Sequence, residues 1–123
     1  MSDSRREIRW VGSSLEDLRR FPEEVRREVG LALFQAQRGE KPASAKPMEG
    51  FKGAKVLKIV EDHDGNTYRV VYTVKFPEVV YVLHCFQKKS KSGIATPKRD
   101  VELIRARFRS VQQIESEQKK WQK

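Results

Sequence analysis

The run from Tyr68 to Phe76 has the clearest hydrophobic pattern in the chain, because apolar and more polar side chains alternate along it without interruption. Successive side chains of a β-strand point to opposite faces, so this alternation predicts a strand with one apolar face. Two further β-forming runs flank it, at residues 55–61 and 79–86, and turn-forming residues separate the three. Such short connections predict an antiparallel meander.

Helical spacing of apolar residues appears in three other places. Ser13 or Ser14 is expected to cap a short first helix, and a second helix is expected to begin at Pro22 and to end before Gly39. Thr96–Pro97 predicts the start of a third helix, with Thr96 as its cap. Its apolar stripe recurs at spacings of three, four and three residues: Val101, Ile104, Phe108 and Val111.

A short strand over residues 7–12 and a loop over residues 40–54 complete the prediction. The predicted order is therefore β-α-α-β-β-β-α, an α+β fold in which an N-terminal helical hairpin and a C-terminal helix pack a small antiparallel β-sheet. We expect two helices to cover one sheet face and the opposite face to stay partly open. Residues 1–123 are expected to form a single domain, with residues 115–123 as a frayed polar tail.

The net charge of the chain and its distribution indicate a binding function. Lysine and arginine number 26 against 17 aspartates and glutamates, for a net charge of +9. Residues 1–50 hold 10 cations and 9 anions, so residues 51–123 hold the other 16 cations and 8 anions. This asymmetry predicts one positive face that suits nucleic acid or another polyanion. The alternative is that the charge only maintains solubility or meets an acidic partner.

Several other classes of function find little support in the sequence. Cys85 is the single cysteine and is expected to be a buried, unreactive thiol in a reducing, cytoplasmic protein. His63 is expected in a solvated turn, and no cluster of residues has metal-ligand spacing, so neither a metal nor a cofactor is expected. No apolar run is long enough to cross a membrane, and the first ten residues lack the core of a signal peptide.

The candidate chemistry lies in cations on the predicted strands. Lys58 and Arg69 lie within strands, where a charged side chain must face water, a partner or a substrate. Lys88 and Lys89 lie at the end of the next strand, so the four side chains are expected to hold a phosphate and to stabilise the pentacoordinate state of phosphodiester cleavage. In RNA the 2′-OH supplies the nucleophile. A snorkelling side chain or an internal salt bridge is the alternative interpretation of Arg69.

His84 is the remaining candidate for proton transfer near neutral pH, although a lone strand histidine is more often structural. The basic stretch that it opens, residues 84–99, contains no acidic residue and also holds Lys91, Lys98 and Arg99. Its position between a strand and a helix start suits contact with a phosphate backbone.

Three segments resemble the phage-derived, HigB-like branch of the RelE/ParE toxin superfamily: Thr67–Tyr72, Leu83–Ser90 and Ala95–Pro97. The resemblance covers roughly residues 7–112. It implies a toxin of a type II toxin–antitoxin module that binds the bacterial ribosome and cuts mRNA in the A site by attack of the 2′-OH. It also implies a helix-turn-helix antitoxin as the partner, and a sheet with helices packed on one side.

The resemblance carries over to individual residues as follows. Arg69 matches the strand arginine that contacts the phosphate, Lys58 matches a strand lysine, and Lys88 and Lys89 match the basic end of the next strand. Three further cations are expected to contact RNA: Lys91, Lys98 and Arg99. The C-terminal tyrosine of RelE has no counterpart, so the general acid and base stay unassigned. Two alternatives remain, a ParE-like inhibitor of DNA gyrase and a non-catalytic nucleic-acid-binding module.

Overall fold

The structure of the protein is a computed structural model that describes residues 5–51, 53–89 and 96–121. Its elements along the chain are β1 (Glu7–Trp10), α1 (Ser14–Arg19), α2 (Glu23–Gln37), β2 (Ala45–Pro47), β3 (Val56–His63), β4 (Asn66–Thr73), β5 (Val79–Lys89) and α3 (Lys98–Trp121). No helix among these residues is long and apolar enough to cross a bilayer.

The five strands form one sheet in the order β1-β5-β4-β3-β2, with β4 at its centre. The predicted antiparallel meander of β3, β4 and β5 is confirmed. The sheet is antiparallel as predicted except at one edge, where β1 pairs with β5 in parallel. The predicted loop 40–54 contains the three-residue strand β2, which is too short for a recognisable alternation and tolerates Pro47 at the sheet edge.

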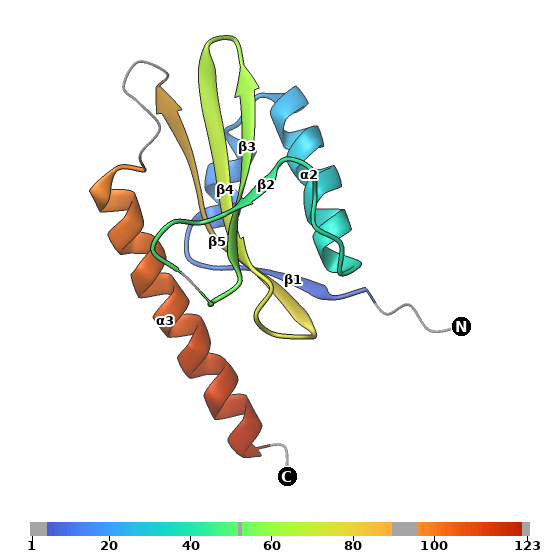
Figure 1. The fold of residues 1–123 in the computed structure, drawn as a ribbon, viewed down its shortest axis with the longest axis vertical. Coiled ribbons are helices and arrows are strands. Elements are labelled where there is room, and N and C mark those ends of the chain that lie inside the picture. Colours follow the sequence, from blue (N-terminus) through green and yellow to red (C-terminus); the bar gives the residue numbers. More distant parts are fainter. Residues whose placement is uncertain (1–4, 52, 90–95, 122–123) are drawn as a thin grey trace.

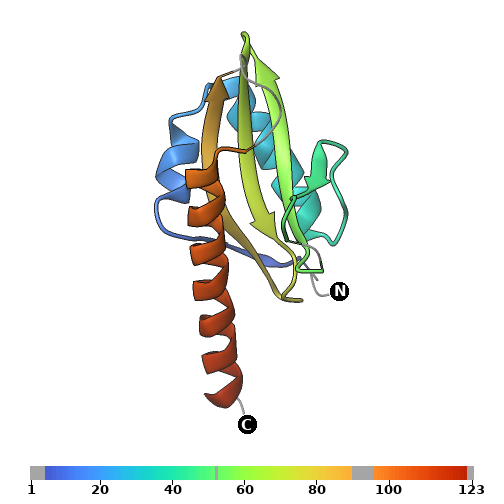
Figure 2. The same cartoon turned by 60° about the vertical axis from the view of Figure 1, so that its left-hand side comes forward.

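Helices cover both faces of the sheet, which corrects the expectation of an open face. α1 and α2 pack on one face and α3 packs on the other (Figures 1 and 2). On the side of α1 and α2, the hydrophobic core contains Tyr68, Val70 and Tyr72, which form the apolar face of the alternating strand β4. The opposite face, here called the α3 face, receives the predicted stripe of α3: Ile104, Phe108 and Val111 pack there in one cluster with Val71, Val79, Tyr81 and Leu83.

A β-bulge between β4 and β5 decides which side chains share the α3 face. Val71 pairs with His84, whereas the next residue, Tyr72, pairs with Val82, so Leu83 is an extra residue in β5. The bulge reverses the alternation, and Leu83 and His84 both lie on the α3 face. Every second residue after His84 then lies on that face too, which brings Lys88 to the same side as Arg69.

The C-terminal end of α3 includes most of the segment for which the sequence predicts a frayed polar tail. Helical structure continues to Trp121, where a frayed tail is predicted from residue 115. Within this segment, Glu115 accepts a hydrogen bond from the hydroxyl of Tyr81. Figures 1 and 2 show that the last turns of α3 extend beyond the end of the sheet.

Candidate functional site

Three cations from three adjacent strands gather on the α3 face, beyond the part that α3 covers. The register pairs Lys58 of β3 with Val71 of β4, and it pairs Arg69 of β4 with Phe86 of β5, so Lys58, Arg69 and Lys88 share one face. Each is nearly buried, with exposed fractions of 8%, 7% and 8%. The structure thus brings together three of the four strand cations that the sequence singles out. We call them the cationic cluster.

The cluster places three positive charges in a nearly buried position, where the loss of hydration disfavours the charged form. Desolvation, followed by the positive charges of Arg69 and Lys58, lowers the pKa of Lys88 below its ordinary value. Buried groups whose pKa is perturbed by near neighbours occur most often at functional sites, because a fold gains nothing from such repulsion. The arrangement can bind an anion such as a phosphate, which neutralises the repulsion.

One carboxylate lies against the cluster, and sequence reasoning missed it. Glu49 follows β2, and its Oε1 accepts a hydrogen bond of 2.9 Å from Nζ of Lys58. That hydrogen bond and the positive charges of Lys58 and Arg69 lower the pKa of Glu49, against a smaller opposing effect of burial. The sequence placed Glu49 in a loop, and only the pairing of β2 with β3, which sets Lys46 opposite Lys58, shows that this segment borders the site.

Arg69 also ties the cluster to the start of α3. Its Nη1 donates a hydrogen bond of 3.3 Å to the hydroxyl oxygen of Thr96. The sequence predicts Thr96 as a helix cap, and α3 does begin directly after Pro97. The hydroxyl of Thr96 therefore takes part in positioning the guanidinium of Arg69, which is a contact that the sequence did not indicate.

His84 lies deeper on the same face. Its Nε2 is 2.7 Å from Oδ1 of Asp100, in the first turn of α3, and its ring stacks on Phe86 with 4.9 Å between the centroids. The side chain of His84 is 8% exposed, and its Nδ1 is buried without a hydrogen-bond partner among the described residues. One ring nitrogen is thus engaged and the other is enclosed, a geometry that suits holding α3 on the sheet.

The other candidate residues are placed unevenly. Lys98 and Arg99 are exposed in the first turn of α3. Lys91 and the side chain of Lys89 lie outside the described part of the structure. Cys85 is buried as predicted. Burial is the largest cause that raises the pKa of its thiol, to about 12, so a thiolate nucleophile is disfavoured at neutral pH.

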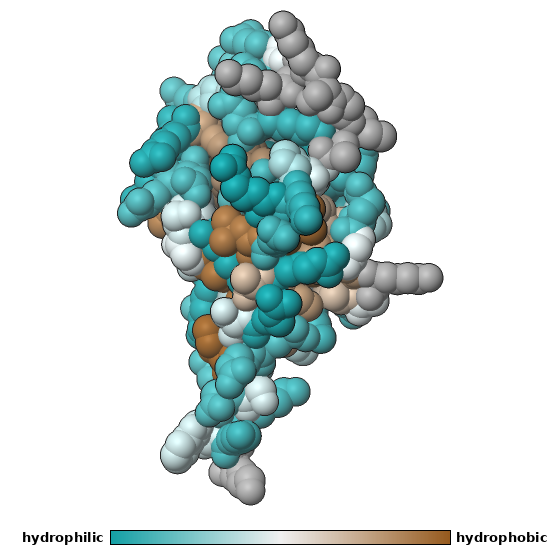
Figure 3. All heavy atoms as spheres, turned by 90° about the vertical axis from the view of Figure 1, so that its left-hand side faces the viewer, coloured by the Kyte–Doolittle hydropathy of each residue, from teal (hydrophilic) through white to brown (hydrophobic). Residues whose placement is uncertain are grey.

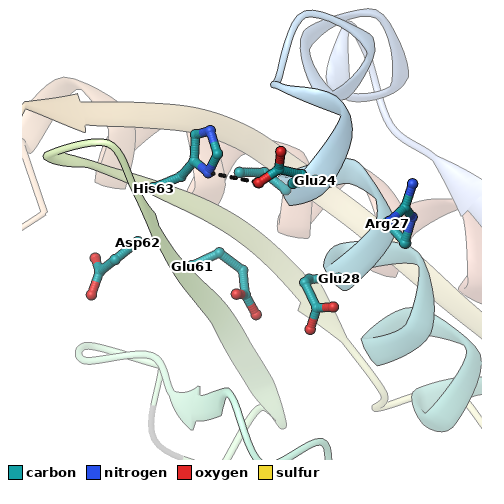
Figure 4. Close-up of a pocket in the computed structure, with 7 residues that line it drawn as sticks. Glu24, Arg27, Glu28, Glu61, Asp62 and His63 are labelled. Atoms are coloured by element: carbon teal, nitrogen blue, oxygen red, sulfur yellow. Dashed lines mark ion pairs between the residues drawn. The ribbon is translucent and has the colours of Figure 1, made fainter.

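His63 does not lie in a solvated turn, as the sequence predicted, but at the end of β3 with 23% of its side chain exposed. Together with Glu24, Glu28, Glu61 and other residues it lines a cavity of about 330 Å³ between α2 and β3 (Figure 4). Carboxylates dominate this cavity, so its charge has the wrong sign for RNA. In the described residues, no group of three or more His, Cys, Asp or Glu side chains could hold a metal ion.

The surface on the α3 side is mostly hydrophilic, with small apolar patches (Figure 3). Among the large apolar side chains of α3, Leu103 is 36% exposed, Ile114 is 46% exposed and Trp121 is 85% exposed. The polar character of this side is consistent with contact to a charged partner such as nucleic acid rather than to a lipid surface.

Comparisons with known proteins agree with this architecture. The profile of the family "Phage derived protein Gp49-like (DUF891)" matches residues 16–109. A mutant of the E. coli toxin RelE in its free state superposes with a TM-score of 0.53 and 19% sequence identity, over 71% of this chain and 85% of that chain.

The toxin–antitoxin complex RelBE2 from Mycobacterium tuberculosis gives a TM-score of 0.48 and 18% identity, over 68% of this chain and 99% of that chain. The comparison with curated proteins gave no significant match. The family profile covers well over half of the chain, and the fold agrees with that of RelE. The protein therefore belongs to the phage-derived Gp49-like family and has a RelE-like fold, as its sequence predicted.

Proposed function

We propose that this protein is the toxin of a type II toxin–antitoxin module and that it cleaves mRNA on the ribosome. The observation that supports the proposal most directly is the cationic cluster, in which Lys58, Arg69 and Lys88 converge from three strands on one sheet face. Family membership and the RelE-like fold are consistent with it. A nearly buried lysine beside two like charges is unfavourable for folding, and a bound anion would offset this cost.

The proposed reaction is an internal transesterification of RNA. The 2′-oxygen attacks the adjacent phosphorus, the O2′–P bond forms and the P–O5′ bond breaks, which leaves a 2′,3′-cyclic phosphate and a 5′-hydroxyl. Arg69 and Lys88 hold the phosphate oxygens, on which negative charge grows in the transition state. Lys88 also donates the proton that the leaving O5′ requires, because a lysine with a lowered pKa gives up its proton more readily.

His84 is a candidate for two roles, proton transfer and positioning. The sequence makes it a candidate for proton transfer, but its hydrogen bond to Asp100 and its enclosed Nδ1 favour a positioning role. We therefore assign His84 and Asp100 to holding the start of α3, and with it Thr96, against the cluster. Lys89 remains a proposed contact at the end of β5.

The proposed partners follow from the charge and from the family. Two exposed cations in the first turn of α3, Lys98 and Arg99, suit contacts to mRNA or ribosomal RNA. Lys91, which lies outside the described residues, is a further proposed contact. A helix-turn-helix antitoxin encoded by a neighbouring gene is the proposed inhibitor, and the cytoplasm is the proposed location.

Cleavage of a reporter mRNA in a bacterial translating extract tests this function. The wild-type protein should cut the mRNA only when ribosomes are present, and Arg69→Ala should abolish the cuts. Arg26→Ala is the matched control, since Arg26 is an exposed arginine on α2, on the opposite side of the sheet. Circular dichroism and the melting temperature establish that both variants are folded.

Two outcomes would reject the proposal in favour of its alternatives. Gyrase-dependent DNA breaks without RNA cleavage would indicate a ParE-like poison. Salt-sensitive RNA binding without cleavage would indicate a binding module in which the same cations only grip the backbone.

A further inference from the structure

We propose that Glu49 is the general base of the reaction: its carboxylate accepts the proton of the attacking 2′-OH, and Lys58 positions that carboxylate. This inference rests on the proposed function and assigns a residue that the sequence resemblance left open. It follows from the geometry of a single ion pair at the edge of the cationic cluster, between Nζ of Lys58 and Oε1 of Glu49.

The two partners of this ion pair differ sharply in exposure. The side chain of Lys58 is 10% exposed, whereas that of Glu49 is 70% exposed. The carboxylate therefore lies on the outer side of the pair, where a substrate arriving from solvent meets it before it meets Lys58. A buried ammonium that donates a 2.9 Å hydrogen bond fixes the direction of an otherwise mobile glutamate.

This arrangement divides the cluster by task. Lys58 is engaged with Glu49, so it acts on the substrate through the carboxylate and is a positioning residue. We assign the phosphate to Arg69 and Lys88, which lie on the same sheet face. Arg69 is also close enough to Glu49 for its charge to contribute to the carboxylate's lowered pKa, which places the base beside the phosphate site.

The protonation states required for the reaction are the ordinary ones at neutral pH. A glutamate whose pKa lies below its usual value is ionised at pH 7 and can accept a proton. The 2′-OH proton passes to Glu49 as the O2′–P bond forms, and the ammonium of Lys88 protonates O5′ as the P–O5′ bond breaks. Glu49 then loses its proton to water and Lys88 regains one, so the enzyme returns to its starting state.

A different interpretation of the same ion pair makes the opposite prediction. The carboxylate of Glu49 would merely occupy the place of a substrate phosphate on Lys58, and RNA would displace it. In that case removing the charge of Glu49 should strengthen RNA binding and leave the chemical rate unchanged or raise it. A general base predicts a lower chemical rate with little change in binding.

The test is single-turnover cleavage on mRNA-programmed ribosomes by the wild-type protein and by Glu49→Gln. Glu117→Gln is the matched control, because Glu117 is an exposed glutamate near the end of α3. We expect Glu49→Gln to cut about 10²–10⁴-fold more slowly, the usual contribution of general acid–base catalysis, with unchanged ribosome affinity. Because the amide oxygen of glutamine can still accept the hydrogen bond from Lys58, the Glu49→Gln variant should stay folded, which circular dichroism and its melting temperature check.

A substrate with sulfur in place of O5′ at the cleavage site separates the base from the acid. A thiolate leaves without needing a proton, so this RNA should restore the part of the rate that Lys88→Met loses with the proton donor, and none of the rate that Glu49→Gln loses. Restored cleavage by Glu49→Gln, an unchanged rate, or tighter binding without a slower rate would each overturn the assignment of Glu49. Loss of cleavage in Arg69→Ala beside full activity in Glu49→Gln would reject the base and leave the proposed function standing.

Discussion

The α3 face of the sheet has two ends that are both buried but differ in composition. At one end Val71, Tyr81 and Leu83 pack with the apolar stripe of α3. At the other end Lys58 and Arg69, in the strands of the same meander, are also less than 9% exposed. The first end follows the rule that buried positions are apolar, and the second breaks it.

The difference indicates what each end contributes. Burial of apolar area stabilises the fold by roughly 25 cal/mol per Å², so the apolar end holds α3 on the sheet. Burial of like charges opposes folding, so the cationic end is retained for another reason, and anion binding is the one that its chemistry supports. The two ends should therefore respond to substitution in opposite directions.

The largest effect is expected at the apolar end. Ile104 of α3 is fully buried against the sheet, and Ile104→Ala should lower the free energy of unfolding by about 2–5 kcal/mol, because it removes apolar contact and leaves a cavity. Urea unfolding followed by circular dichroism measures the change. The neighbouring Leu103 is 36% exposed, and Leu103→Ala should cost far less. Equal losses in the two variants would contradict the packing of α3 described above.

The next effect lies at the junction of the two ends, where Asp100 contacts His84 at 2.7 Å. Asp100→Ala leaves the nearly buried imidazole without this partner and should cost about 1–3 kcal/mol of stability. Glu102→Ala is the control, because Glu102 is exposed in the same turn of α3. A stability equal to that of the wild type would show that the histidine does not hold the helix start.

Sequence reasoning found the elements whose pattern repeats and missed those that depend on pairing. The alternation around Arg69 and the stripe around Phe108 each contain enough residues to fix a face, and both predictions were confirmed. The strand β2 has only three residues, so no alternation of apolar and polar side chains can be recognised in it. The bulge at Leu83 arises from the register between two strands, which no single strand encodes.

The candidate site shows the same division. Its cations stand out because charges within β-forming runs are rare, so Lys58 and Arg69 could be singled out from their neighbours alone. Glu49 lies in a segment rich in proline and glycine, where a glutamate is ordinary. Only the hairpin of β2 and β3 places it beside Lys58. Side chains that meet across strands are thus less predictable than those that break a pattern within one strand.

A smaller effect, of the opposite sign, is expected at the cationic end. Replacing Lys88 with methionine keeps most of the side-chain volume and removes a repelled charge, so Lys88→Met should raise the melting temperature. The gain should shrink in the alkaline range. Because the pKa of Lys88 is lowered in the folded state, the unfolded chain binds more protons between that pKa and the ordinary value of 10.5.

Stability of the wild type therefore rises with pH across this window relative to Lys88→Met, and thermal melts of both proteins from neutral to alkaline pH measure the difference. Gln113→Met, on the exposed surface of α3, controls for the methionine itself. A melting temperature that falls in Lys88→Met at neutral pH would show that the lysine stabilises the fold, and the contrast between the two ends would fail.

The smallest expected effect is a shift in the titration of Lys88 itself. Desolvation contributes most to its lowered pKa, and the charges of Arg69 and Lys58 contribute the rest, in that order. Removing the larger source of repulsion in Arg69→Met should therefore raise the pKa of Lys88 part of the way toward its ordinary value, and Lys58→Met should raise it less. The ¹³Cε chemical shift of Lys88, followed by NMR against pH, measures both changes. Equal pKa values in the wild type and in Arg69→Met would mean that the two side chains do not sense each other, and one phosphate could not then be held by both.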